Sequence, residues 1–485
     1  MSRASSGGSS AAGVHPFTEL TGPLAGLEDE KTMRKYRLIR AVLGAAALAA
    51  AALLPAAAED IPDPFAQLRA QGAAGGDGGD GGDGGEAEVP LIIPEPPSFE
   101  AQSWVLMDHA TGQVIFEHNA HERIWPASLT KMMTSYVLGM EFKAGRVSED
   151  DEVLITEDAW SKRYGDSSKM FIEVGKRIRL GDLNRGIIIQ SGNDACVAVA
   201  IHLAGSEEGF VSVMNSYGRR LGLNDTHFSN VHGLYDEQNY SSAYDMALLG
   251  RALIRDLPEE YAIYREKEFV FNNIRQLNRN RLLWDETLNV DGIKTGHLSQ
   301  VGYNLAASAA NGSMRLIAVV IGAKSENQRA AHCRQMLTYG FRFFEHYQPF
   351  EAGKPILRRE VRMGTENHVD LVVSSFGEGV VIPRGAQRDI SVRYRLRSAR
   401  FIAPIAKDEQ LGILTYHLRD RVIASYPLVA AESIEEGGFL IKSWDRAVMF
   451  FGSEEDSAES TIEQSGGPAA GGAGAPAPAA GGGAA

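Results

Sequence analysis

Cysteine is almost absent from this chain: among 485 residues there are only two, Cys196 and Cys333. At most one disulfide can form, so the sequence excludes a small fold stapled by several disulfides. Basic residues are also outnumbered, with 48 Lys and Arg against 62 Asp and Glu, which gives a formal net charge of −14. Because the phosphates of nucleic acids require a basic surface, this charge argues against a nucleic-acid partner.

The apolar run near the N-terminus is too short for a typical membrane span. Residues 41–54 are rich in alanine and follow a basic segment, and 56–58 are three alanines of the kind found at signal-peptidase sites. We predict a signal peptide over 33–58, cut after the last of these alanines, rather than an uncleaved anchor. We therefore expect export to the periplasm, with Met33 as the native start and 1–32 as a non-native extension.

Two tracts have too few apolar residues to form a core. Residues 71–86 are a glycine–aspartate repeat, and 454–485 are an acidic stretch followed by Gly, Ala and Pro. Such compositions remain disordered because they bury too little apolar surface to offset the entropy of ordering. We predict a disordered linker with a Pro-rich spacer over 59–98 and a disordered tail over 453–485.

Between these tracts the sequence predicts two domains. Residues 99–348 mix helical and strand patterns and are expected to be α/β, opening with a hairpin around Thr111-Gly112. Residues 354–431 contain short alternating runs and few helix signals, which predicts a small β-sandwich. These runs cover 368–373, 379–382, 390–394 and 412–417.

The first of three polar motifs is Ser128-Leu-Thr-Lys131, which opens a run with apolar residues at helical spacing. Residues three apart share one helix face, so Lys131 is predicted to lie one turn from the Ser128 hydroxyl. The N–H groups at a helix start favour negative charge that develops there. Lysine acts as a base only when burial or a cation lowers its pKa, and Lys294 is the candidate for that cation.

Two further motifs follow in order, Ser191-Gly-Asn193 and Lys294-Thr295-Gly296. The first falls on a tight turn between two apolar segments, where a hydroxyl and an amide can point into a cleft. The second precedes a hairpin with the turn Asn311-Gly312, and its glycine lets a substrate backbone approach closely. Together the three motifs predict a serine acyl-transfer site that uses lysine, not histidine, as its base.

The motifs and their flanks resemble those of the low-molecular-mass penicillin-binding proteins, the serine-type D-alanyl-D-alanine carboxypeptidases of the peptidase S11 family. The resemblance covers about 99–450 and includes the matching stretches 180–184, 188–195, 282–284, 289–297 and 340–344. It implies a β-lactamase/DD-peptidase-like α/β domain, with helices around an antiparallel sheet, and a role in cell wall biogenesis.

The resemblance also implies the catalytic roles. Ser128 would attack the penultimate D-alanine of a peptidoglycan stem peptide, and Lys131 would take its proton. Ser191 would relay a proton to the departing D-alanine, while Asn193 would hold the substrate and the Lys131 head group. No metal or organic cofactor is implied, and β-lactam antibiotics would acylate the same serine.

The substrate's terminal carboxylate would be bound by Lys294 and Thr295, and Arg279 and Arg329 fall where the family places further basic side chains. Those two arginines could equally be plain surface charges. The oxyanion hole implied by the resemblance consists of the backbone N–H groups of Ser128 and His297.

The segment 437–452 is predicted to be an amphipathic helix. Its apolar side would carry Leu440, Ile441, Trp444, Ala447, Val448 and Phe451. We expect 439–451 to attach the protein peripherally to the outer face of the cytoplasmic membrane, because the helix is too short to span a bilayer. A helix that packs on the β domain is the alternative.

Three other functions remain open. A class A-type β-lactamase shares the three motifs but requires a glutamate four residues before Asn184, where this chain has Leu180. A catalytically decayed peptidoglycan-binding module is disfavoured by the intact motifs. Endopeptidase activity on cross-links would use the same residues.

Overall fold

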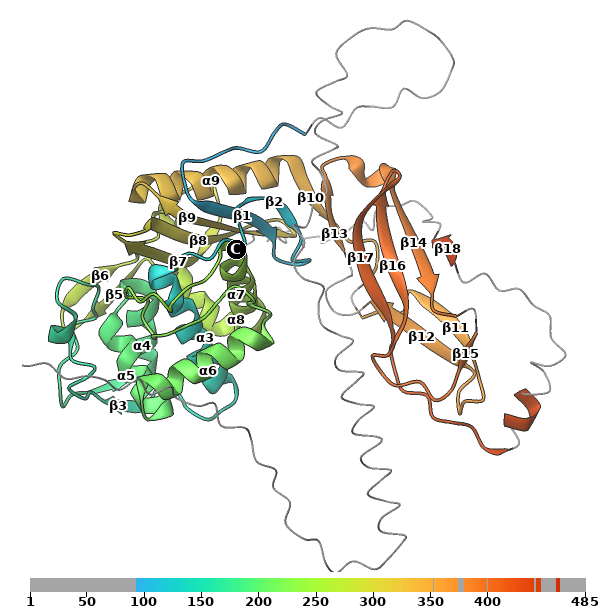
Figure 1. Cartoon of the computed structure of the whole chain (residues 1–485), viewed down its shortest axis with the longest axis horizontal. Coiled ribbons are helices and arrows are strands. Elements are labelled where there is room, and N and C mark those ends of the chain that lie inside the picture. Colours follow the sequence, from blue (N-terminus) through green and yellow to red (C-terminus); the bar gives the residue numbers. More distant parts are fainter. Residues whose placement is uncertain are drawn as a thin grey trace, which may run out of the picture. The chain divides into compact units, whose positions relative to one another are not determined.

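The structure is a computed structural model that describes residues 93–351, 353–373, 379–398, 400–439, 442–445 and 459–462 (Figure 1). The predicted N-terminal extension, signal peptide and glycine–aspartate linker lie outside the described residues, as does most of the C-terminal tail. Two folded regions follow one another along the described chain, and each is described by itself.

The first region combines helices with an antiparallel sheet, as the sequence predicted. Its helices are α3 (Lys131–Lys143), α4 (Leu180–Arg185), α5 (Asn193–Ala204), α6 (Glu207–Arg220), α7 (Ala243–Asp256), α8 (Pro258–Tyr261) and α9 (Glu326–Phe343). Its strands are β1 (Ser103–Asp108), β2 (Val114–His118), β3 (Glu152–Leu154), β4 (Arg177–Arg179), β5 (Glu268–Phe271), β6 (Ile274–Leu277), β7 (Val290–Leu298), β8 (Gly302–Asn311) and β9 (Met314–Ala323).

The main sheet has five strands in the order β2-β1-β9-β8-β7, and every pairing in it is antiparallel. Both of its faces are covered. In β9, Ile317, Val319 and Ile321 pack with the core that contains α3, α5 and α7, whereas the alternating residues face the core beneath α9. Successive strand side chains point to opposite faces, so a largely apolar strand such as β9 suits a sheet between two helical layers (Figure 1).

Both predicted hairpins of this region are confirmed. β1 and β2 pair around Thr111-Gly112, and β8 and β9 pair around Asn311-Gly312. Gly112 and Gly312 have φ angles of 75° and 58°, the left-handed conformation that glycine adopts without steric cost. β7 is an edge strand of the sheet, so no further strand pairs with the outer side of the third motif.

The second region is all-β, as predicted. Its strands are β10 (Phe344–Tyr347), β11 (Leu357–Arg362), β12 (His368–Val373), β13 (Val380–Pro383), β14 (Ile390–Leu396), β15 (Phe401–Ile402), β16 (Gln410–Leu418), β17 (Arg421–Ala430) and β18 (Glu459–Ile462). Seven of them form one sheet in the order β15-β11-β12-β17-β16-β14-β18, and β10 pairs with β13.

The structure differs from the predicted boundaries in two places. β10 starts directly after α9 and pairs with β13, so 344–347 belong to the second region rather than to the first. β18 lies inside the tail that was predicted to be disordered, and it pairs with the edge of β14. A sheet edge offers unpaired N–H and C=O groups, and even a short polar strand can satisfy them.

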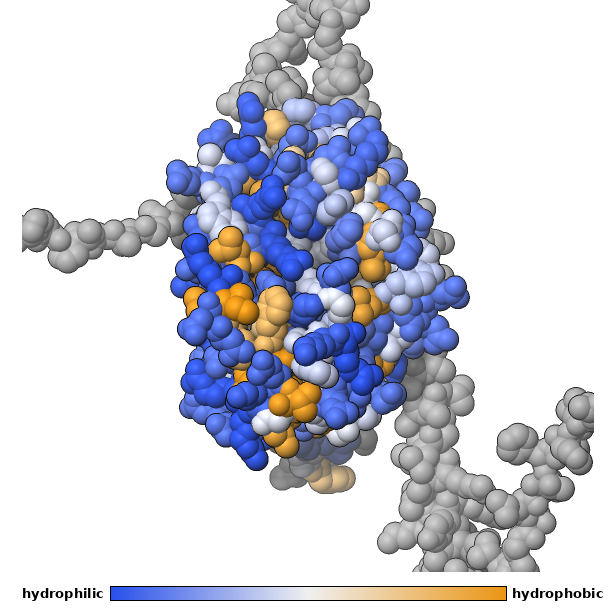
Figure 2. Space-filling model, turned by 90° about the vertical axis from the view of Figure 1, so that its left-hand side faces the viewer, coloured by the Kyte–Doolittle hydropathy of each residue, from blue (hydrophilic) through white to orange (hydrophobic). Residues whose placement is uncertain are grey.

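Of the predicted amphipathic helix, 437–439 and 442–445 are described. Gly437 and Gly438 are not helical, whereas Phe439 and 442–445 are. Phe439 and Trp444 are 83% and 72% exposed. Among the described residues, no single helix has the length and composition of a membrane span; only α5 and α6, a pair bent by 87°, pass that test together. The face in Figure 2 is largely hydrophilic, and its apolar side chains lie in small groups.

Candidate active site

The first motif lies where a 3₁₀ turn, Ala127–Thr130, runs into α3. Lys131, the first residue of α3, is only 1% exposed, and its Nζ lies 3.0 Å from the Ser128 Oγ. Nζ also donates a hydrogen bond to the backbone carbonyl of His232. The predicted proximity of serine and lysine is therefore confirmed, and the amine is held from two sides.

Burial determines the charge state of this lysine. It lowers the pKa of Lys131 to about 8, and the Arg279 cation acts in the same direction. Lys294 is the cation that the sequence predicts for this role. Burial lowers the pKa of Lys294 as well, and the charge of Lys131 lowers it further, so the two lysines repel one another.

The second and third motifs meet through Ser191 and Lys294. The Lys294 Nζ donates to the Ser191 Oγ at 2.9 Å, and both side chains are buried. Ser191 has a φ of 67°, at the turn between a π-helical segment, Gly186–Gln190, and α5. This left-handed turn directs the hydroxyl toward β7, as the tight turn predicted from the sequence requires.

Asn193 occupies a different environment from the one expected. Its Nδ2 donates to the Ser167 Oγ at 2.9 Å, and its backbone N–H donates to the Ser168 carbonyl. The expected contact with the Lys131 head group is replaced by the His232 carbonyl. Asn193 thus secures the 166–172 loop, which forms one wall of the cleft.

Asp194 reinforces this wall. Its carboxylate is fully buried and accepts hydrogen bonds from the backbone N–H groups of Met170, Phe171 and Ile172 at 2.8–3.3 Å. A buried carboxylate without partners would be strongly destabilising, and these donors compensate for its desolvation. Asp194 is thus a positioning residue that none of the three motifs predicted.

β7 passes directly beside the nucleophile. A Cβ added to Gly296 would lie 3.0 Å from the Pro126 carbonyl and 3.3 Å from the Ser128 N. Asn304 on β8 binds the same turn, because its Nδ2 donates to the Pro126 carbonyl at 3.2 Å. Glycine is therefore required at 296 so that the strand and the nucleophile's N–H can approach one another.

These elements enclose a cleft of about 430 Å³. Of the residues predicted from sequence, its lining includes Ser128, Ser191, Asn193, Arg279, Thr295, Gly296, His297 and Arg329. Arg329 is 4% exposed, and its Nη1 donates to the Gly296 carbonyl at 3.0 Å. The His297 ring packs against Tyr303, with 4.2 Å between the ring centroids.

Comparison with known proteins gives a consistent result over both regions. A D-alanyl-D-alanine carboxypeptidase family model matches residues 91–325, and a model of the penicillin-binding protein 5 C-terminal domain matches 344–436. D-alanyl-D-alanine carboxypeptidase DacC of Escherichia coli is 47% identical over 360 residues, which cover 74% of this chain and 90% of that protein. This chain belongs to the D-alanyl-D-alanine carboxypeptidase family.

More distant relatives and solved structures agree with this membership. DacF of Bacillus subtilis is 34% identical, with 70% of this chain and 87% of that protein aligned. The crystal structure of penicillin binding protein 5 from Haemophilus influenzae is 46% identical, with a TM-score of 0.67, and the match covers 70% of this chain and 99% of that one.

The buried lysine predicts how acylation by this family member depends on pH. Only the neutral amine can accept the Ser128 proton, so the rate rises as pH increases through the pKa of Lys131, which is about 8. We expect an ascending limb with a midpoint near that value in the second-order rate constant for a β-lactam. A limb with a midpoint near 6.5, typical of an unperturbed histidine base, would contradict this role of lysine.

Proposed function

We propose that this chain removes the terminal D-alanine from peptidoglycan pentapeptides through an acyl-enzyme on Ser128. The observation that carries the proposal is the buried Lys131 amine, 3.0 Å from the Ser128 hydroxyl and with a pKa lowered to about 8. A nearby amine that is readily neutral can activate a serine that would otherwise be a weak nucleophile.

In the acylation step, Lys131 accepts the Ser128 proton as Oγ attacks the carbonyl of the penultimate D-alanine. The backbone N–H groups of Ser128 and His297 stabilise the negative charge that develops on the carbonyl oxygen. The close approach of Gly296 to the Ser128 N supports this pairing, because it brings the end of β7 beside the nucleophile.

The second and third motifs protonate the leaving group and bind its carboxylate. The Ser191 hydroxyl, 2.9 Å from the Lys294 Nζ, relays the proton that Lys131 took from Ser128 to the nitrogen of the departing D-alanine. Lys294 and Thr295, with Arg279 and Arg329 in the same cleft, attract the substrate's terminal carboxylate. This carboxylate also favours the charged form of Lys294, which burial alone disfavours.

Water then hydrolyses the acyl-enzyme and regenerates Ser128. A β-lactam forms the same bond, but we expect its adduct to persist. A class A-type β-lactamase uses a glutamate to drive deacylation, and the corresponding Leu180 is a fully buried apolar residue at the start of α4. These facts favour a penicillin-sensitive peptidase over a β-lactamase.

The test uses wild-type protein and Ser128→Ala with a pentapeptide that ends in D-Ala-D-Ala. We expect the wild type to release D-alanine and to retain a fluorescent penicillin, whereas Ser128→Ala does neither while its circular dichroism is unchanged. Rapid loss of the label would support a β-lactamase. Folded wild-type protein without release or label would leave only the binding-module interpretation.

We also propose that the protein is exported, acts in the periplasm and is attached peripherally to the outer face of the cytoplasmic membrane. The signal-like segment 33–58 and the exposed Phe439 and Trp444 support this location. Anionic vesicles should retain the wild-type protein in flotation and release Trp444→Ala. Equal retention of the two proteins would contradict the anchor.

A further inference from the structure

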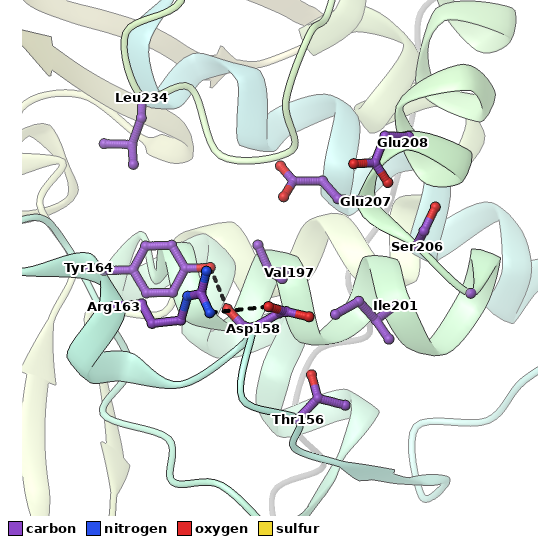
Figure 3. Close-up of a pocket in the computed structure, with 11 residues that line it drawn as sticks. Thr156, Asp158, Arg163, Tyr164, Val197, Ile201, Ser206, Glu207, Glu208 and Leu234 are labelled. Carbon is purple, nitrogen blue, oxygen red and sulfur yellow. Dashed lines mark hydrogen bonds and ion pairs between the residues drawn. The ribbon is translucent and has the colours of Figure 1, made fainter.

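A second cavity, of about 530 Å³, adjoins α5 and the start of α6 (Figure 3). Leu234 lines both this cavity and the catalytic cleft. The neighbouring Glu207 and Glu208 of α6 also line it, but they differ in environment: Glu207 is partly buried, whereas Glu208 is exposed. The proposed mechanism does not use this partly buried carboxylate.

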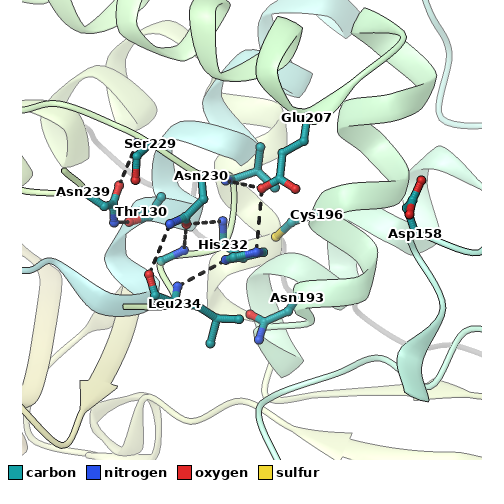
Figure 4. A network of polar contacts seen from close by, with 12 residues as sticks. Thr130, Asp158, Asn193, Cys196, Glu207, Ser229, Asn230, His232, Leu234 and Asn239 are labelled. Atoms are coloured by element: carbon teal, nitrogen blue, oxygen red, sulfur yellow. Dashed lines mark hydrogen bonds and ion pairs between the residues drawn. The ribbon is translucent and has the colours of Figure 1, made fainter. Parts of the chain in front are cut away.

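Glu207 contacts the loop that supplies the Lys131 carbonyl partner (Figure 4). Its Oε1 accepts a hydrogen bond from the Val231 N–H at 3.3 Å and lies 3.7 Å from the His232 Nε2. Asn230 holds the same loop from within, since its Oδ1 accepts from the His232 and Gly233 N–H groups. Glu207 and Asn230 thus hold the backbone on both sides of the His232 carbonyl.

The contacts of the His232 ring determine which of its nitrogens carries the proton. The Leu234 N–H donates to Nδ1 at 3.2 Å, so the proton of the neutral ring is on Nε2, which faces Glu207. Burial lowers the pKa of His232 to about 3, and the charge of Lys131 lowers it further. The ring therefore stays neutral, with its Nε2 facing the carboxylate at 3.7 Å.

From these contacts we infer that Glu207 is a positioning residue for the general base. It fixes the backbone at 231–232, and this backbone fixes the direction of the Lys131 amine. A neutral amine has two N–H groups and one lone pair. When one N–H is directed to the His232 carbonyl, the lone pair can point to Ser128 Oγ. The inference rests on the proposed acyl transfer at Ser128.

The test measures the rate constant for acylation by benzylpenicillin across pH, and kcat and KM for D-alanine release, in Glu207→Gln, Glu207→Asp and Glu208→Gln. We expect the plateau rate of Glu207→Gln to fall about tenfold, because small misplacements of a catalytic group are costly. The midpoint near pH 8 and KM should not change. Glu207→Asp keeps the charge but shortens the reach, so it should lose a similar factor.

Glu208→Gln is the matched control, since it makes the same charge change one residue along α6. It should retain the wild-type rate. The inference is overturned if Glu207→Gln keeps the wild-type plateau, if its midpoint moves to lower pH with the plateau unchanged, or if Glu208→Gln loses as much activity. An inactive wild type would instead refute the proposed function. Should Glu207→Gln not fold, Glu207→Asp decides the question alone.

Discussion

Lys131→Met is expected to abolish nearly all acylation while the protein remains folded. Methionine occupies a similar volume in the buried site but cannot accept the Ser128 proton. General-base catalysis typically contributes about 10²–10⁴-fold, so the acylation rate constant should fall by a factor in that range. The measurement is the second-order rate constant for benzylpenicillin at pH 9, where most of the wild-type lysine is neutral.

Lys143→Met provides the control, because Lys143 is an exposed lysine at the end of the same helix. This variant should acylate at the wild-type rate. If Lys131→Met retained more than a tenth of the wild-type rate with unchanged thermal unfolding, lysine would not be the base.

Gly233→Ala should damage both stability and activity. Gly233 has a φ of 79°, and a Cβ there would lie 1.8 Å from the Ala127 carbonyl oxygen, directly before the nucleophile. The left-handed backbone and the overlap together should cost about 2–5 kcal/mol in the free energy of unfolding. The displaced loop should slow acylation about 100-fold, because it carries the His232 carbonyl. Urea unfolding and benzylpenicillin acylation measure the two effects.

Gly222→Ala separates the two causes. Gly222 has a φ of 74°, but nothing lies within 4 Å of the added Cβ. The backbone strain alone should cost about 1–2 kcal/mol, and acylation of the folded protein should be unchanged. Equal losses in the two variants would show that the contact with Ala127 is unimportant.

Local sequence signals were sufficient for much of the fold and for the nucleophile. Helical spacing placed Lys131 one turn from Ser128, and the dipeptide turns placed both hairpins correctly. Such features depend on neighbours within a few residues, where backbone geometry restricts the possible arrangements. The family of the site was identified from its three motifs, because they name residue types at fixed positions. The spacing of apolar residues indicates only helices and strands.

Contacts between distant segments could not be predicted in the same way. The His232 carbonyl that binds Lys131 is 101 residues away, and any backbone carbonyl has the same chemistry whatever its side chain. Asn304 binds the Pro126 carbonyl across 178 residues. Only the folded sheet and loop bring these groups together, so the sequence carried no local signal for them.

The expected contact between Asn193 and Lys131 failed for a related reason. The resemblance supplied a residue role, but the partner depends on the 166–172 loop, whose backbone N–H groups bind the distant Asp194. β18 likewise depends on the open edge of β14 rather than on its own composition. In both cases the partner is set by segments that are distant in the sequence and meet only in the folded protein.

The most direct test of the account is the covalent adduct with benzylpenicillin. Intact-mass spectrometry of the wild-type protein should show one adduct per chain, and peptide mapping should locate it on Ser128. The adduct should persist after free antibiotic is removed, and Ser128→Ala should form none. An adduct on another residue, or no adduct on folded protein, would contradict a lysine-activated Ser128 as the centre of this enzyme.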